Sequence, residues 1–260
     1  MPPFQSLEIF RSGDVVTLRL TRPQLHNRFD AILHSEFPAA LAAIAGMDGI
    51  AAVVLAADGR SFSAGGDLAM MLEANASRDL RDRLQAEALA IVEGLLSIPV
   101  PVIAAVQGTA IGLAATIIAC CDMVVCWRDA LIADPHVVLG LVAGDGGVLG
   151  WSQSVGVLRA RRYLLTGDSI TGAQAHAMGL VTDVADTVAD VEPMAMALAA
   201  KVATLPRGGV RGTKAAFSEL TRRLYGPTFE ASLAAEMVTL ASDEVRATVQ
   251  RTLNRQNQKG

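Results

Sequence analysis

The sequence predicts an α/β fold followed by a helical C-terminal arm. Segments with the pattern of buried strands alternate with segments of helical periodicity, and this alternation is typical of an α/β architecture. From Thr187 onward nearly the whole sequence has helical character. Hydrophobic residues make up 52% of the chain and charged residues 18%, against roughly 45–50% and 25% in an average soluble protein. The chain is therefore expected to have a large core and to associate with itself.

The first hundred residues predict two strands, a helix, a third strand and a second helix. Two short strands flank a Ser-Gly-Asp turn in LEIFRSGDVVTLRLTRP. Residues 30–44 have helical periodicity, in which Pro38 should introduce a kink or a new turn. The apolar segment AAVVLAA (51–57) indicates a buried strand. An amphipathic helix follows in SRDLRDRLQAEALAIVEGLLS, with Ser77 as its N-cap.

The middle of the chain continues the alternation. IPVPVIAAV (98–106) predicts a strand with prolines at its start. GTAIGLAATIIACC is expected to be a buried helix that runs into the strand DMVVCW, and both ALIAD and HVVLGLV are expected to be extended. LPRGG (205–209) is the best boundary between core and arm. We therefore predict a mixed core over residues 1–205 and a helical oligomerisation arm over residues 206–260.

The net charge and the length of the longest apolar stretch exclude two classes of partner. The chain has 22 basic and 26 acidic residues, a net charge of −4, and no block of Lys and Arg that could follow a phosphate backbone. Its longest apolar stretch has 14 residues, whereas a membrane span needs roughly 18 or more. We expect no nucleic acid and no membrane as partners.

The N-terminus and the cysteines predict a cytoplasmic location. MPPFQSLEIFRSGD lacks the basic segment, apolar run and cleavage site of a secretion signal. Cys120, Cys121 and Cys126 are an odd number within seven positions, which forms neither a disulfide framework nor a metal-binding set. They are expected to be reduced and buried.

One apolar stretch, ADPHVVLGLVAGDGG (133–147), contains three polar residues that are costly to bury alone: Asp134, His136 and Asp145. A carboxylate that orients an imidazole is a common general-base arrangement. Asp145 is expected to open a helix, where the helix dipole favours an acid. The alternative is that Asp145 is only an N-cap and His136 a satisfied core residue.

Four blocks of the sequence resemble, in order, the signature blocks of the enoyl-CoA hydratase/isomerase, or crotonase, superfamily: FSAGGDL (62–68), VQGTAIGLAATIIACCD (106–122), ADPHVVLGLVAGDGG (133–147) and LLTGDSITGAQAHAMGLV (164–181). Together they are specific for the superfamily but not for one reaction. The resemblance implies a crotonase-like spiral of strand-strand-helix units, assembled as a homotrimer or a dimer of trimers. It also implies an acyl-CoA thioester as substrate, with no metal and no cofactor beyond the CoA of the substrate.

The resemblance assigns an oxyanion hole to the first two blocks. The backbone N–H groups of Gly66 and Leu113 would stabilise the thioester oxyanion, each contributing ~10²–10³ in rate. Leu113 stands where many members have Gly, although its N–H is retained. Five neighbours are expected to contact substrate or CoA: Ala64, Gly65, Asp67, Leu68 and Gly112. Asp67 could instead hydrogen-bond the oxyanion loop, and SAGGDL alone could be an ordinary strand-to-helix turn.

The resemblance fails at the catalytic carboxylates. Hydratases of the superfamily use two Glu residues, and the matching positions here are Thr116 and His136. Thr cannot act as a general base near neutral pH, so the two-carboxylate mechanism cannot operate unchanged. His136 is expected to be the principal acid/base residue, with Asp145 as its partner and Thr116 limited to positioning water.

Three reactions remain open. Hydration or double-bond isomerisation of an enoyl-CoA leads, because proton transfer beside a stabilised enolate is the common step of the family. The second is hydrolytic carbon–carbon cleavage of a β-dicarbonyl compound, because some hydrolases of the superfamily use a His–Asp pair with similar spacing. The third is a non-catalytic acyl-CoA-binding paralogue, because both Glu residues are absent.

Other polar residues have weaker indications. His26 lies near the place where family members contact CoA, and it either touches CoA or caps a helix. His34 and His176 fall in helical patterns and are expected at the surface. Asp134 is expected to shape the turn before His136. Three cations are candidates for contacts with CoA phosphates: Arg22, Arg28 and Lys214.

Overall fold

Two sheets form the core of the computed structural model, which describes residues 4–258. The strands of the larger sheet are β1 (Leu7–Ser12), β2 (Val15–Leu20), β3 (Ala52–Ala57), β5 (Val102–Val106), β7 (Met123–Trp127) and β10 (Asp183–Ala185). The strands of the smaller sheet are β4 (Ser61–Ser63), β6 (Thr109–Ile111), β8 (Leu131–Ala133) and β9 (Ile170–Thr171). Strand order follows the chain in both sheets, as β1-β2-β3-β5-β7-β10 and β4-β6-β8-β9.

The helices connect and cover these sheets. In chain order they are the short 3-10 helix η1 (Pro23–Leu25), α1 (Ala31–Ala45), α2 (Leu68–Ala76), α3 (Arg78–Ser97), α4 (Leu113–Ala119), α5 (His136–Leu139), α6 (Gly147–Val155), α7 (Val157–Leu164), α8 (Gly172–Met178), α9 (Val188–Ala203), α10 (Arg207–Leu240) and α11 (Asp243–Asn257). A strand of the large sheet, a strand of the small sheet and then one or more helices repeat along the chain, as in β3-β4-α2 and β5-β6-α4. The predicted α/β spiral of strand-strand-helix units with a helical arm is confirmed.

Local sequence signals account for the helices that flank the site. The Asp30 carboxylate accepts the backbone N–H groups of Ile32 and Leu33, at 3.1 Å each, and so caps α1. Pro38 lies within α1 without ending it. Ser77 caps α3 as predicted, its hydroxyl accepting the Leu80 N–H at 3.2 Å. Both helices therefore begin at fixed positions beside the sheets.

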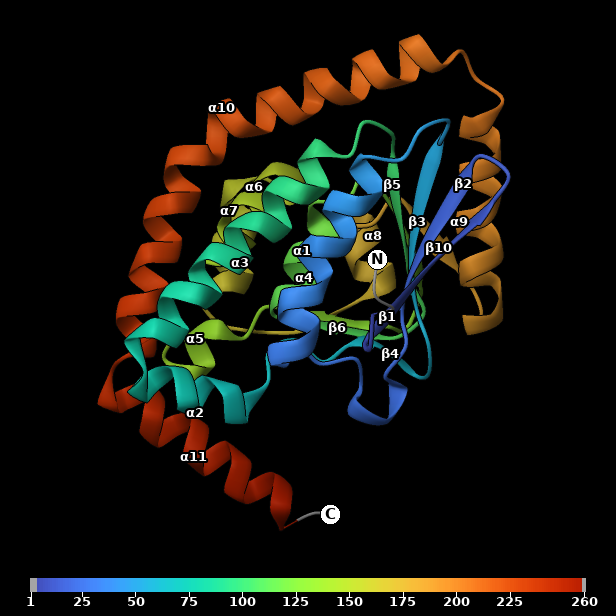
Figure 1. Ribbon diagram of the computed structural model, residues 1–260. Helices are drawn as coiled ribbons and strands as arrows, with labels where there is room; N and C mark the ends of the chain where they lie inside the picture. The colour runs from blue at the N-terminus through green and yellow to red at the C-terminus, as the bar shows by residue number, and fades with distance from the viewer. Residues whose placement is uncertain (1–3, 259–260) are drawn as a thin grey trace.

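Helices cover both faces of the large sheet (Figure 1), and apolar side chains are buried on each face. On one face, α1, α3 and α4 bury a core that includes Leu33, Phe37 and Ile91. On the other, α9 packs its fully buried Val191 and Ala195 against the sheet. Because both faces of the large sheet are covered, a site can form at the ends of the strands.

The C-terminal arm extends across the molecule. After α9 ends at Ala203, α10 begins at Arg207, close to the predicted boundary. In Figure 1, α10 starts above α9, arches over the top and descends on the opposite side, where it reaches α11. Helix α10 packs against α3 and α6, and α11 packs against α2. The arm thus covers helices of the core.

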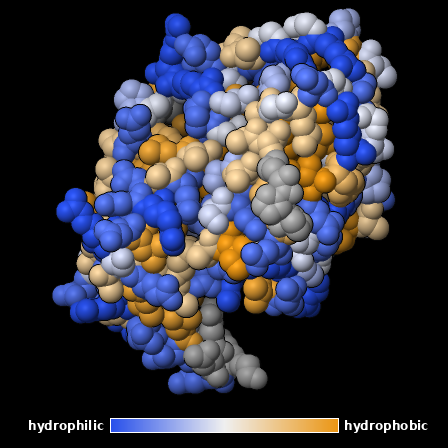
Figure 2. Space-filling view, in the orientation of Figure 1, coloured by the Kyte–Doolittle hydropathy of each residue, from blue (hydrophilic) through white to orange (hydrophobic). Residues whose placement is uncertain are grey.

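Large apolar side chains remain exposed on the arm and around α7. Leu158 is 82% exposed on α7, and Phe217 and Leu224 are about 60% exposed on α10. In Figure 2, apolar side chains are interspersed with polar ones over the face seen in Figure 1. Within residues 4–258, no helix combines the length and the apolar character needed to cross a membrane.

Two local predictions were wrong. The segment from Gly108 begins as strand β6, and helix α4 starts only after Gly112, whose φ of +55° makes the turn between them. HVVLGLV was expected to be extended because Val favours strands, but its first part forms the single-turn helix α5. Gly140 ends α5 with a φ of +87°, so glycine chemistry and packing override the β-propensity.

The cysteine prediction holds for two of the three residues. Cys120 and Cys126 are buried and Cys121 is half-buried, and all three are free thiols. Burial raises the pKa of the Cys126 thiol to about 12. Such thiols are protonated at neutral pH and are poor nucleophiles.

Candidate active site

A cavity of about 650 Å³ lies where the two segments predicted to form the oxyanion hole meet α2, α5 and the C-terminal arm. Its wall includes Gly66, Leu113, His136 and Asp145, which the sequence predicted to share a site. It also includes the five predicted substrate-contact residues: Ala64, Gly65, Asp67, Leu68 and Gly112. Thr116 is fully buried and lies outside this wall.

The two segments predicted to form the oxyanion hole approach so closely that glycine is required at position 65. Gly65 has a φ of +79°, and a Cβ there would lie 2.4 Å from the carbonyl oxygen of Ile111. No larger residue fits without moving backbone. The Ser63 hydroxyl accepts the Gly65 N–H at 3.1 Å and donates to the Asn27 carbonyl at 2.7 Å. The first segment is thereby held in shape and joined to the backbone at Asn27.

Both predicted donors have N–H groups available to a ligand. Leu113 is the first residue of α4, a position whose N–H has no partner within the helix. Gly66 forms a bridge with Phe29, and that bridge uses the N–H groups of Phe29 and Asp67. Among residues 4–258, neither the Gly66 nor the Leu113 N–H donates to another protein group.

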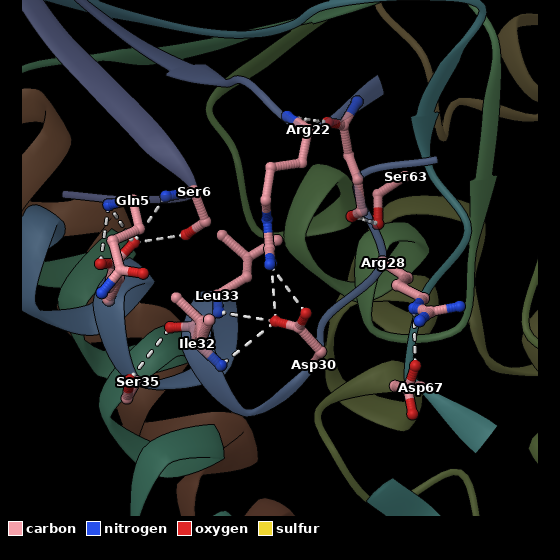
Figure 3. A network of polar contacts seen from close by, with 12 residues as sticks. Gln5, Ser6, Arg22, Arg28, Asp30, Ile32, Leu33, Ser35, Ser63 and Asp67 are labelled. Carbon is pink, nitrogen blue, oxygen red and sulfur yellow. Dashed lines mark hydrogen bonds and ion pairs between the residues drawn. The ribbon is translucent and has the colours of Figure 1, made fainter. Parts of the chain in front are cut away.

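Asp67 fixes the start of α2 and orients a cation at the cavity. Its carboxylate accepts the Met70 N–H at 2.8 Å and forms an ion pair with Arg28 at 2.6 Å (Figure 3). SAGGDL is thus a strand-to-helix turn that also lines the cavity. Arg28 is the candidate phosphate contact that lies in the cavity wall.

The other two candidate phosphate contacts are wrong. Arg22 is buried and binds Asp30 through two hydrogen bonds of 2.6 and 2.7 Å (Figure 3). Lys214 is buried in an ion pair with Asp122 at 2.7 Å. Both lie outside the cavity wall, because their charges are used within the core.

His136 lies among three carboxyl groups. Its Nδ1 contacts the Asp134 carboxylate, and its Nε2 lies 3.4 Å from Asp145 Oδ2 and 3.9 Å from Glu236 Oε1. All four residues are buried. The structure therefore brings His136 and Asp145 together and adds two acids to the pair.

Asp134 does more than shape the turn before His136. A carboxylate accepts hydrogen bonds, so its contact with Nδ1 places the ring proton there. Nε2 is then directed toward Asp145 and Glu236. Asp134 thus orients the imidazole, a role the sequence reasoning had given to Asp145.

Asp145 is not the N-cap of α6, contrary both to the expectation that it opens this helix and to the alternative interpretation, although its carboxylate accepts a hydrogen bond from the backbone of Gly147. The N-cap of α6 is Gly146, and α6 begins at Gly147. The Thr116 hydroxyl donates to Asp145 Oδ1 at 2.9 Å. Because Thr116 is fully buried, its hydroxyl is engaged in positioning this carboxylate.

Glu236 was missed by the sequence reasoning. It lies on α10, 92 residues after Gly144, whose N–H it accepts at 3.1 Å. Its neighbours on the same helix face, Leu233, Met237 and Leu240, also line the cavity. A single acid on an otherwise apolar helix face was the signal that could have identified it.

The environment shifts the pKa values of three of these groups. Burial alone would lower the pKa of His136, but the charges of Asp134, Asp145 and Glu236 hold it well above its ordinary value. Burial raises the pKa of Asp145, with the charge of Asp134 adding to the shift and His136 opposing it. Burial and the charges of Asp145 and Asp134 raise the pKa of Glu236 to about 8. With a pKa of about 8, Glu236 retains its proton at neutral pH.

The same cluster contains donor atoms suited to a divalent cation. One ligand atom from each of Asp134, His136 and Asp145 can be chosen so that all lie within 4.8 Å of one another. Both ring nitrogens of His136 already face carboxylates. A bound cation would have to displace one of these contacts.

The remaining histidines differ in exposure. His176 is exposed, as predicted. The prediction for His34 was wrong, because this residue is buried and lines the cavity. Its Nδ1 lies 2.6 Å from Glu87 Oε2, and this pairing between α1 and α3 compensates the burial. His26 is the C-cap of η1, as one of its two predicted roles requires, and it also lines the cavity, where contact with CoA stays a prediction.

Comparisons with known proteins agree in sequence and structure. The family model for enoyl-CoA hydratase/isomerase matches residues 11–258. The 2,3-dehydroadipyl-CoA hydratase of Escherichia coli (strain K12) is 34% identical over 197 residues, which cover 76% of this chain and 75% of that protein. An enoyl-CoA hydratase/isomerase structure from Mycobacterium paratuberculosis has a TM-score of 0.92 at 32% identity, covering 96% and 100% of the two chains. A β-diketone hydrolase from the cyanobacterium Anabaena sp. PCC 7120, bound to (S)-3-oxocyclohexyl acetic acid, has a TM-score of 0.83 at 26% identity, covering 92% and 95%.

Proposed function

Since the chain belongs to the enoyl-CoA hydratase/isomerase family, we propose that it hydrates or isomerises an enoyl-CoA thioester through acid/base catalysis at His136. The observation that carries the proposal is the position of His136 Nε2, 3.4 Å from Asp145 Oδ2 in a cavity that Gly66 and Leu113 also line. A titratable imidazole with an orienting carboxylate is suited to move a proton near neutral pH.

The thioester oxygen is bound by the backbone N–H groups of Gly66 and Leu113. These groups have no protein partner among residues 4–258, so they can donate to the oxygen as negative charge develops. The negative charge of an enolate is stabilised there without rearrangement of the protein. This accounts for the close, glycine-dependent contact of the two segments.

His136 and Glu236 divide the proton transfers in hydration. Neutral His136 removes a proton from water as the water oxygen bonds to C3 of a 2-enoyl group, and the electrons of the double bond form the enolate. C2 then takes a proton from Glu236, whose raised pKa of about 8 keeps it protonated at neutral pH. In isomerisation, His136 removes a C2 proton from a 3-enoyl group to form a dienolate, and C4 then takes a proton from Glu236 as the double bond moves to C2–C3.

A second candidate is hydrolytic carbon–carbon cleavage of a β-dicarbonyl compound. It is favoured by the His136 cluster, in which the catalytic base is an imidazole surrounded by acids, and by the similarity to the β-diketone hydrolase. Water activated by His136 would attack one carbonyl carbon. The bond from this carbon to the central carbon would then break, and its electron pair would remain on the central carbon as an enolate. The released enolate would take a proton, leaving a carboxylic acid and a ketone.

Product analysis distinguishes these reactions. The protein is incubated separately with crotonyl-CoA, a 3-enoyl-CoA and a cyclic β-diketone, and the products are identified by mass spectrometry and NMR. Water addition with the chain intact or a moved double bond supports the first proposal, whereas ring opening supports the second. Calorimetric binding of acyl-CoA without any turnover would instead indicate the non-catalytic paralogue.

The assembly is a homotrimer or a dimer of trimers. Exposed apolar residues on α7 and α10, such as Leu158 and Phe217, support burial between subunits. Light scattering should give a mass of three or six chains. A stable monomer at micromolar concentration would contradict this assembly.

A further inference from the structure

A second histidine–carboxylate pair has its histidine in the wall of the same cavity and takes no part in the proton transfers above. His34 on α1 and Glu87 on α3 are joined by a contact of 2.6 Å between Nδ1 and Oε2. Their side chains are 9% and 16% exposed, so the pair is largely removed from water. The ring of Phe29 packs edge-on against His34, with 6.4 Å between ring centroids. The imidazole is therefore held from two sides.

This pairing leaves the other ring nitrogen for a ligand. Glu87 can only accept when ionised, so Nδ1 of His34 carries the proton in the contact. Within residues 4–258, Nε2 of His34 has no hydrogen-bond partner. This atom is not completely buried by the protein. Because His34 lines the cavity, this nitrogen has access to a bound molecule.

Apolar residues of α2 and α3 form part of the cavity wall to which His34 belongs. Leu84 and Ala88 on α3 and Met70 on α2 line the same cavity and are apolar. In binding pockets, a few polar groups in an apolar wall fix the orientation of the ligand and set its specificity. A wholly hydrocarbon ligand would cover Nε2 without giving it a partner, which is unfavourable.

We propose that His34 is a specificity-determining residue that binds a hydrogen-bonding oxygen, a hydroxyl or a carbonyl, on the acyl group of the substrate. This inference rests on the proposed acyl-CoA function. The neutral ring would accept from a hydroxyl, and the charged ring would donate to a carbonyl. Glu87 supports either contact by fixing the ring, so Glu87 is a positioning residue.

The test uses three acyl-CoA thioesters that differ only in this oxygen: 2-hexenoyl-CoA and its 5-hydroxy and 5-oxo derivatives. For the wild-type protein, kcat/KM for one oxygenated substrate should exceed that for 2-hexenoyl-CoA by roughly tenfold or more, the scale of one buried polar contact. His34→Leu should reduce this ratio to about one, and His34→Gln, which keeps a hydrogen-bonding group, should restore part of it. The ratio distinguishes recognition from a general loss of folded protein.

Two further variants complete the experiment. Glu87→Gln should reduce the ratio less than His34→Leu, and His176→Leu, which changes an exposed histidine, should leave it intact. Equal kcat/KM for all three substrates with the wild-type protein would overturn the proposal, as would a ratio that survives in His34→Leu.

Calorimetry separates this inference from the proposed reaction. The saturated hexanoyl-CoA and its 5-hydroxy and 5-oxo derivatives are titrated into the wild-type protein. Tighter binding of an oxygenated thioester without turnover would contradict the reaction and support the role of His34. Equal binding of all three, or no binding, would overturn that role.

Discussion

At the level of single residues, the site is defined by the imidazole of His136, which lies among three carboxyl groups. Asp134 binds one ring nitrogen of His136, while Asp145 and Glu236 approach the other. The cluster avoids three buried negative charges because Glu236 keeps its proton at neutral pH. The same arrangement supplies a proton acceptor and a proton donor side by side.

His136→Ala should reduce kcat by roughly 10²–10⁴, the usual contribution of a general acid/base residue. Acyl-CoA affinity should change little, because the oxyanion donors are backbone groups that the substitution retains. Steady-state kinetics and calorimetric titration measure the two effects separately. Full activity in His136→Ala would refute the assignment, and Thr116→Ala should have the smaller effect because Thr116 acts only through Asp145.

The pH dependence of kcat/KM should report the raised pKa of His136. A base must be deprotonated, so the rising limb of activity should have an inflection above the ordinary value of 6.5, and activity should fall again as Glu236 loses its proton at about pH 8. Asp134→Asn removes one of the charges that raise this pKa, so the inflection should move to lower pH. Asp168→Asn, at an exposed position, is the matched control. An unchanged inflection in Asp134→Asn would contradict the role of Asp134.

At the level of elements, the arm contributes directly to the site through α10. Glu236 accepts the N–H of Gly144, and the cavity wall continues into Leu253 of α11. The predicted division at residue 205 therefore separates elements that build one cavity. A change that moves α10 should alter stability and catalysis together.

Glu236→Gln should make stability less dependent on pH. The folded pKa of Glu236, about 8, lies above the ordinary value of 4.5, so folding retains a proton that the unfolded chain loses. The resulting stability is complete below pH 4.5 and is lost as pH rises through about 8. The difference in Tm, variant minus wild type, should therefore increase between these values. A constant difference would show that Glu236 is ionised in the folded protein.

Two glycine substitutions should have opposite effects on the arm. A Cβ at Gly144 would lie 2.3 Å from the Ser232 carbonyl oxygen of α10, so Gly144→Ala should destabilise by about 1–3 kcal/mol, as overpacking does. Gly212 lies within α10 with nothing within 4 Å of an added Cβ, so Gly212→Ala should stabilise by up to about 1 kcal/mol. Denaturant unfolding measures both. Equal effects would show that α10 does not pack on the loop at Gly144.

The elements that could be predicted are those with a local cause. The all-apolar β3, the capped helix α3 and the helical arm each follow from residues close together in the chain. The three-residue strand β6 was not recognised because it depends on pairing with β4 and β8. The segment 133–147 identified His136 and Asp145, but it contains no information on Glu236, which reaches the site through tertiary packing. His34 was placed at the surface because its partner, Glu87, lies on another helix.

At the level of the whole molecule, a ligand in the cavity contacts both the core and the arm. A molecule that binds only the folded state at 100 times its Kd stabilises by about 2.7 kcal/mol. Acyl-CoA should therefore raise Tm and slow amide exchange in α2 and α11, which pack together at the cavity. Free CoA is the control for contacts made outside the acyl group. Protection confined to the core would contradict a cavity closed by the arm.

The position of Glu236 also has a consequence for protein synthesis. The chain is made from its N-terminus, and Glu236 lies 100 residues after His136 in the sequence. Asp134, His136 and Asp145 are therefore synthesised well before the last carboxyl group of their cluster. A chain still on the ribosome cannot place all four residues together until α10 has been made.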